Sequence, residues 1–112
     1  AGKVHEKVYD VAWSGARKLD SKTGKVPAVG NTVDVPSATW TNTIGVPELI
    51  AVWKDPEFDG SQLAFYYGRV IEIPTPRWTA YDVKYFNVKA DPKTPMTLQE
   101  RAYTSPIWYT PK

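Results

Sequence analysis

The amino-acid sequence predicts an all-β fold, an antiparallel β-sandwich-like domain with at most one short helix. Ten prolines and seven glycines interrupt its 112 residues every few positions, and such interruptions disfavour long helices. The segments between them are short and rich in β-branched and aromatic residues, which are the residues that strands favour. The length is typical of one domain, so we expect a single β-rich domain over residues 1–112.

Four segments in the first half of the chain have the composition and the alternation of strands. They span residues 6–14, 31–35, 38–43 and 47–53. In the first of them, Tyr9, Val11 and Trp13 alternate onto one apolar face, which we expect to point inward. Pro36 separates the second from the third, and its missing N–H favours an edge strand or a bend there.

The strongest strand is expected over residues 63–73, where aromatic and aliphatic side chains alternate onto both faces. This pattern favours a central strand that is covered on both sides. Gly68 lies in its middle and indicates a bulge or a close approach of another backbone. Pro74 and Pro76 end the strand, because neither can donate to a ladder.

The last third of the chain has two segments that could be helical. Residues 79–88 fit either a turn of helix or a loop. Residues 96–102 have helical propensity, with Thr97 and Glu100 spaced as in a capping box, so we expect at most one short helix there. Residues 107–110 are expected to form a final strand.

The residue inventory argues against catalysis by this chain. It has no cysteine and one histidine, His5, so neither a thiolate or histidine-rich metal site nor a Ser-His-Asp triad is expected. Asp55, Glu57 and Asp59 alternate along the sequence, but a solvated turn is the simpler interpretation. We therefore expect no enzymatic activity, no cofactor and no metal in this chain.

Charge and hydropathy exclude two classes of partner. The net charge is only +2 and the basic residues are dispersed among 12 acidic ones, whereas nucleic-acid-binding proteins concentrate basic residues in a stripe. No apolar run approaches the ~18 residues of a membrane helix. The chain starts at Ala1 without an initiator methionine, and we expect it to be a piece of a longer protein.

The best candidate for a binding surface is the segment 75–82, which is expected to be a loop held by two prolines. It brings together a planar cation, two aromatic rings and a carboxylate, the side chains of Arg77, Trp78, Tyr81 and Asp82. Loops carry binding residues more often than other segments do. Two interpretations stay open: a functional surface, or a structural clamp in which Arg77 stacks on Trp78 or pairs with Asp82.

The aromatic content, 13% of the residues, is the one unusual quantity in the composition. Aromatic rings on a β-sheet can form a platform that stacks on sugars, so an aromatic-platform carbohydrate-binding module is the alternative function. Large side chains filling a small core explain the same content. The core interpretation is favoured, because Trp13, Trp53, Phe65 and Tyr67 lie at positions that are expected to alternate inward.

Five segments also carry a family resemblance. They are KVYDVAWSGAR (residues 7–17), VGNTVDV (29–35), NTIGVPELIAVWKDPEFD (42–59), AFYYGRVIEIPTPRWTAYD (64–82) and QERAYTSPIWYTP (99–111). They resemble the C-terminal end of the DUF3604 family, whose members are long bacterial proteins named only as containing a domain of unknown function. The resemblance covers nearly the whole chain.

The resemblance implies a non-catalytic accessory domain of a longer protein. Members of the family look like metal-dependent hydrolases of the PHP type, related to polymerase-and-histidinol-phosphatase domains, and their metal ligands would lie upstream of the matched part. The implied partner is therefore the upstream catalytic domain of the same polypeptide. The ending SPIWYTP (residues 105–111) also resembles the closing strand of other PHP-type hydrolases. Export signals are frequent in the family, which implies a periplasmic or secreted location.

Overall fold

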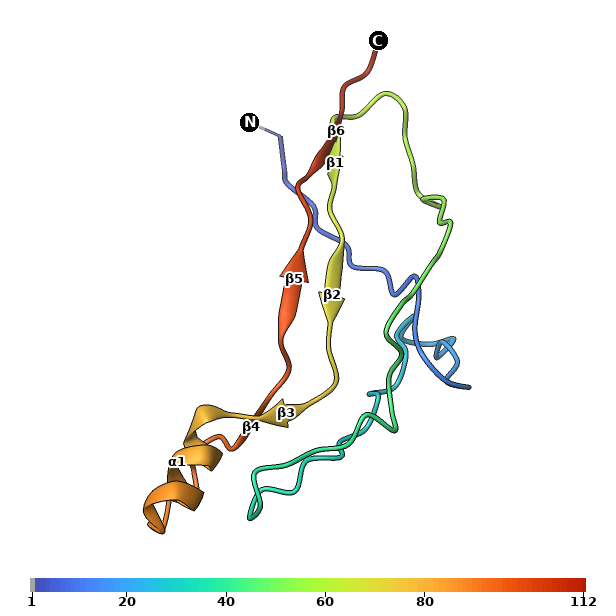
Figure 1. Ribbon diagram of the computed structural model, residues 1–112. Helices are drawn as coiled ribbons and strands as arrows, with labels where there is room; N and C mark the ends of the chain where they lie inside the picture. The colour runs from blue at the N-terminus through green and yellow to red at the C-terminus, as the bar shows by residue number, and fades with distance from the viewer. Residues whose placement is uncertain (1) are drawn as a thin grey trace.

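The computed structural model describes residues 2–112, and its paired strands all lie in the second half of the chain (Figure 1). Each pair is antiparallel and two-stranded. The pairs are β1 (Ala64–Tyr66) with β6 (Ile107–Tyr109), β2 (Arg69–Ile71) with β5 (Arg101–Tyr103), and β3 (Thr75–Pro76) with β4 (Thr97–Leu98). One helix, α1 (Trp78–Phe86), lies between β3 and β4.

The three strand pairs follow one another end to end and form one long hairpin, here called the β-ribbon (Figure 1). The predicted all-β class with a single short helix is confirmed. Within residues 2–112 the strands do not stack as two packed layers, because no second sheet lies against the β-ribbon. The segments that were expected to build a second layer do not pair.

Residues 2–62 contain no helix and no strand. The prediction of strands at residues 6–14, 31–35, 38–43 and 47–53 is wrong. Among residues 2–62 the structure has one isolated β-bridge, between Asp34 and Thr39. The physical reason is that strand propensity describes how well side chains pack on a pleated surface. Without a neighbouring strand, the backbone groups of such a segment have no partners and no ladder forms.

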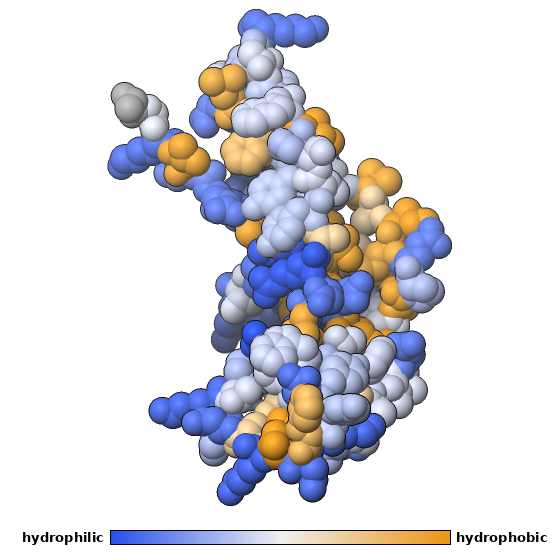
Figure 2. Space-filling view, turned by 60° about the vertical axis from the view of Figure 1, so that its left-hand side comes forward, coloured by the Kyte–Doolittle hydropathy of each residue, from blue (hydrophilic) through white to orange (hydrophobic). Residues whose placement is uncertain are grey.

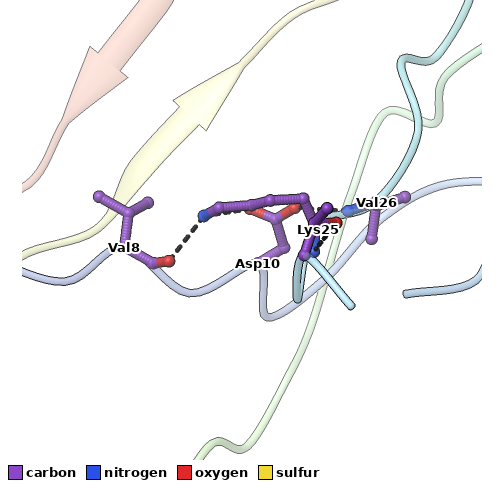
Figure 3. Close-up of polar contacts among 5 residues, drawn as sticks. Val8, Asp10, Lys25 and Val26 are labelled. Carbon is purple, nitrogen blue, oxygen red and sulfur yellow. Dashed lines mark hydrogen bonds and ion pairs between the residues drawn. The ribbon is translucent and has the colours of Figure 1, made fainter. Parts of the chain in front are cut away.

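Side chains hold this first half together in place of a ladder. The Asp10 carboxylate accepts a hydrogen bond from the Val26 amide at 2.8 Å (Figure 3). The Lys25 ammonium donates to the Val8 carbonyl at 2.6 Å and lies 3.5 Å from Asp10. These contacts tie the N-terminal segment to the turn that follows it, but they order only a few residues.

Helix α1 occupies the segment that fitted either a helical turn or a loop. Its end is marked by Asn87, which has φ 50° and ψ 45°, the left-handed conformation that asparagine tolerates at a helix C-terminus. The Val88 amide then donates back to the Val83 carbonyl at 3.2 Å. The helix expected over residues 96–102 is wrong, because most of that segment pairs as β4 and β5. Pairing across the β-ribbon overrides its local propensity.

A β-bulge interrupts the β-ribbon between its first two strand pairs. Residues 67–68, between β1 and β2, lie opposite residues 104–106, between β5 and β6. The arm with β5 and β6 therefore carries one extra residue. A Cβ atom at Gly68 would lie 3.2 Å from Cγ2 of Thr104, which confirms the close approach expected at this glycine. Because one extra residue reverses the alternation of side chains, the bulge keeps Tyr103 on the same face as Trp108.

The described residues bury very little. Only Ser14, Ala38, Pro76 and Ala80 are buried among residues 2–112. The accessible surface is 9593 Å², whereas a folded monomer of this mass exposes about 6,200 Å². The radius of gyration is 18.9 Å, against about 13 Å for a compact domain of this length. Figure 2 shows hydrophobic side chains reaching the surface at several places along the molecule.

Candidate functional site

The four residues predicted to form a binding loop lie in regular structure. The expectation of a loop over residues 75–82 is wrong, because Thr75–Pro76 is strand β3 and α1 begins at Trp78. Arg77, between them, has extended backbone angles, φ −75° and ψ 158°. Its amide donates to the Met96 carbonyl at 2.8 Å, which attaches the start of the helix to the opposite arm of the β-ribbon.

The side chains of the predicted site are mostly exposed. The Arg77 guanidinium lies 5.9 Å from the centre of the Trp78 ring, within the range of a cation–π contact. Trp78 remains 62% exposed, and Tyr81 is exposed as well. No ion pair joins Arg77 to Asp82 in the described structure. The residues share the first turns of α1, but they enclose no pocket.

A second surface, which sequence reasoning did not identify as a site, runs along one face of the β-ribbon. Its rings belong to Phe65, Tyr67, Tyr103 and Trp108, and Arg69 and Arg101 continue it toward β3; these six residues are here called the open face. Directly paired residues of antiparallel strands point to the same side. Phe65 pairs with Trp108, and Arg69 pairs with Tyr103, so both strands contribute to it.

The rings of the open face form a continuous row. The Phe65 ring lies 5.1 Å from Trp108 and 6.3 Å from Tyr67, centre to centre. Tyr67 lies 6.2 Å from Tyr103. Trp108 is 72% exposed, and the other three rings are also exposed. Tyr67 donates to the Glu6 carboxylate at 3.1 Å, and this hydrogen bond raises the pKa of the Tyr67 hydroxyl.

The opposite face of the β-ribbon, with Ala64, Tyr66, Ile107 and Tyr109, is here called the covered face, because residues 53–60 pack on its two tyrosines, although Ile107 stays exposed. The Tyr66 ring meets Trp53 edge-on, with 6.4 Å between ring centres. Its hydroxyl donates to the Asp55 carboxylate at 2.7 Å, which raises the pKa of Tyr66. Tyr109 donates to the Gly60 carbonyl at 3.0 Å.

Two open hollows lie outside the open face. One, of about 440 Å³, is formed where residues 53–58 meet the covered face, with Trp53, Asp55 and Tyr66 in its wall. The other, of about 540 Å³, lies between α1 and the turn at Pro36 and has a mostly apolar lining that includes Met96. Both are shallow depressions at places where one segment of the chain covers another.

A small polar cluster stands beside the first hollow. Glu57 accepts hydrogen bonds from Lys7 and from Tyr9, each at 2.6 Å. The bond from Lys7, followed by that from Tyr9, lowers the pKa of the Glu57 carboxyl. The same contacts with Glu57 raise the pKa of both Lys7 and Tyr9. Lys7 and Glu57 are exposed and Tyr9 is half-buried, so the cluster is a surface contact that joins the N-terminal segment to residues 55–59.

Across residues 2–112, no group of three or more His, Cys, Asp or Glu side chains is arranged to hold a metal ion. The acidic residues of the 55–59 turn form local hydrogen bonds: Asp55 and Asp59 each accept one from the backbone amide two residues further along the chain.

Among residues 2–112, no helix is long and apolar enough to cross a membrane.

Comparison with known proteins identifies a family. The family model described as "Protein of unknown function (DUF3604)" matches residues 1–111. No curated protein and no solved structure matches the chain. Since the match covers 1–111 of 112 residues, this chain belongs to the DUF3604 family.

Proposed function

We propose that this chain is a non-catalytic accessory region that packs on the rest of a longer DUF3604 polypeptide. The observation that carries the proposal is the 9593 Å² of exposed surface. This exceeds the surface of a folded monomer of the same mass by about 3,400 Å². Much of it is apolar, with large side chains such as Ile50, Val52 and Ile107 exposed by more than two thirds. A further body is needed to remove that surface from water.

The amount of excess surface favours the same polypeptide over a second protein. Each partner of an obligate interface contributes about 1,000–2,500 Å², which is less than the excess here. A surface of this extent is typical of residues that share a core with other segments of one domain. The proposal that this body is a PHP-like hydrolase domain is supported by the likeness of residues 105–111 to the closing strand of such enzymes.

The proposal is tested by comparing the isolated chain with the full-length gene product. The isolated 112 residues are expected to bind the dye ANS and to unfold gradually in urea, because few contacts cooperate. In the full-length product, the same residues are expected to resist protease and dye. An isolated chain that binds no dye and unfolds in one sharp transition would show an independent domain and overturn the proposal.

The second candidate function is carbohydrate binding, which would use the exposed rings of the open face. The ring of Trp108 is tilted by 35° from that of Phe65, so the row does not form one flat platform. The rings also account for only part of the excess surface, which is why packing is the better-supported function. Titration of the full-length product with soluble oligosaccharides, repeated with Trp108→Ala, tests this candidate: binding that the variant loses would establish it.

A further inference from the structure

The two arginines of the open face have no partners among the described residues. Arg69 and Arg101 are exposed, and neither guanidinium makes a hydrogen bond or an ion pair within residues 2–112. Arg17 provides the contrast within the same chain. Its side chain donates to the carbonyls of Ser14 and Pro27, at 3.1 and 2.8 Å, and to the Ser14 hydroxyl. The half-buried Arg17 thus has hydrogen-bond acceptors within the chain, whereas the guanidinium groups of Arg69 and Arg101 have none among the described residues.

The register places the nearby carboxylates elsewhere. Arg101 pairs directly with Ile71, two residues beyond Arg69, so both guanidinium groups project from the same face. Glu72 and Glu100 come next in the ladder, joined by a backbone bond of 3.0 Å. Strand alternation directs their side chains to the opposite face. The β-ribbon thus separates its charges, with cations beside the aromatic row and the two glutamates behind.

The carboxylate of Glu6, which reaches the ring row, is already engaged. Glu6 accepts the hydrogen bond of Tyr67, and it forms no ion pair with Arg69 in the described structure. If another body covers the open face, the two guanidinium groups lose their water. An uncompensated buried charge is strongly destabilising, so the covering surface has to supply acceptors.

We propose that the open face docks on a surface of the same polypeptide that presents carboxylates to Arg69 and Arg101. The inference rests on the proposed function and names the chemistry of its partner surface: apolar side chains opposite the ring row, and Asp or Glu opposite the two arginines. The planar guanidinium pairs with a carboxylate through two parallel bonds, which sets the register of docking. Trp, Tyr and Arg are also the residues that dominate interface energetics.

Single-stranded nucleic acid is the other ligand that rings and arginines recognise together. Charge argues against it here. Phosphate backbones attract several cations in a row, whereas the open face offers two, and the whole chain carries only +2. The large excess of apolar surface is also left uncovered by a nucleic-acid strand. A protein surface that presents carboxylates would pair with the two arginines and would also cover the excess apolar surface.

The test is made on the full-length gene product with Arg69→Glu/Arg101→Glu. Repulsion from the partner carboxylates is expected to open the interface and to increase protease cleavage within this region about tenfold or more, since cleavage follows the population of the open form. Lys18→Glu/Lys22→Glu is the matched control, because it changes the charge equally at two exposed lysines whose ammonium groups form no hydrogen bond or ion pair in the described structure. This control is expected to leave cleavage unchanged.

A milder pair keeps the test decisive if the glutamate variant does not fold. Arg69→Gln/Arg101→Gln removes the charges without adding repulsion and is expected to raise cleavage in the same direction. Cleavage equal to that of the lysine control in both arginine variants would overturn the inference. If Trp108→Ala still opened the region in that case, the proposed function would stand, whereas no effect of any variant would count against both.

A nucleic-acid titration supplies an independent check. A labelled single-stranded oligonucleotide at physiological salt is expected not to bind the full-length product. Binding that is lost in Arg69→Gln/Arg101→Gln would overturn the inference in favour of nucleic acid. Absence of binding, together with increased cleavage in the arginine variants, would support a docking surface with carboxylates.

Discussion

The two faces of the β-ribbon are built by the same strands but differ in what lies against them. On the covered face, Tyr66 and Tyr109 are half-buried, and each finds a hydrogen-bond acceptor in residues 53–60. On the open face, Trp108 is 72% exposed and Arg69 has no partner in the described structure. The open face carries four aromatic rings and the covered face two, and only the two rings of the covered face have a neighbouring segment of the described chain packed on them.

The open face is therefore the side of the β-ribbon on which further packing is expected. A two-stranded hairpin is marginally stable by itself and needs packing against a further layer. The covered face receives part of that layer from its own chain. The open face has the side chains for it, rings and guanidinium groups, but its rings stay exposed among residues 2–112, where Tyr67 is held by a hydrogen bond to Glu6. Variants on the two faces are expected to differ in how far they lower the stability of the full-length gene product.

The largest effect is expected for Trp108→Ala in the full-length gene product. If another body covers the open face, the variant removes a buried aromatic side chain and lowers the free energy of unfolding by about 3–5 kcal/mol. Urea unfolding of the full-length product measures the change. A loss of less than about 1 kcal/mol, as for ordinary surface positions, would show that Trp108 faces water there as well.

A smaller loss is expected for Trp53→Ala on the covered face. Trp53 contacts Tyr9, with ring centres 4.9 Å apart, and Tyr66, and it remains 39% exposed. Because part of the ring is already in water, the loss should be about 2 kcal/mol, below that of a fully buried aromatic residue. The same urea experiment measures it. A loss equal to that of Trp108→Ala would remove the distinction between the two faces.

A hydroxyl deletion separates the two faces more finely. Tyr66→Phe removes the hydrogen bond to Asp55 and leaves that carboxylate with one donor fewer, so a measurable drop in melting temperature is expected. Tyr103→Phe is the matched control on the open face, because the Tyr103 hydroxyl bonds to nothing among residues 2–112. Equal drops in melting temperature would mean that both hydroxyls are bonded in the full-length product.

The smallest effect concerns pH and the Glu57 cluster. The folded pKa of Glu57 lies below its ordinary value of 4.5, so its contribution to stability is complete above that pH and is lost as pH falls through the lowered pKa. Tyr9 has a raised pKa, so its contribution is complete below 10.0 and is lost at higher pH. Glu57→Gln should therefore flatten the acid side of the melting-temperature profile. An unchanged profile would show that the cluster contributes nothing.

Parts of the β-ribbon were predictable from local pattern. The alternation over residues 63–73 and the apolar run at 107–110 both correspond to paired strands, and Gly68 lies opposite the bulge, which is between β5 and β6. Each of these signals is short-range: period-2 alternation, β-branched side chains and a glycine at a close approach. The strand expected at 6–14 has the same signals and no partner, which is why pattern alone misplaced it.

The candidate site was predictable only in part. Sequence reasoning brought Arg77, Trp78, Tyr81 and Asp82 together, and they do share the start of α1. It missed the open face, because Arg101 and Trp108 are far from Arg69 and Phe65 along the chain. The bulge in addition shifts the alternation between β5 and β6, so that Tyr103 and Trp108 share a face although they are five positions apart, an odd spacing that puts residues of a regular strand on opposite faces.

The β-rich class and the lack of long helices follow from the sequence alone, because prolines and glycines interrupt it every few residues and β-branched and aromatic residues lie between them. The length of each strand, its partner and the faces that remain exposed depend on the tertiary structure. Pairing depends on register between distant segments, and the covering of a face depends on what packs against it. Residues 96–102 show the reason: local propensity favours a helix there, and the hydrogen bonds offered by β2 and β3 make them strands.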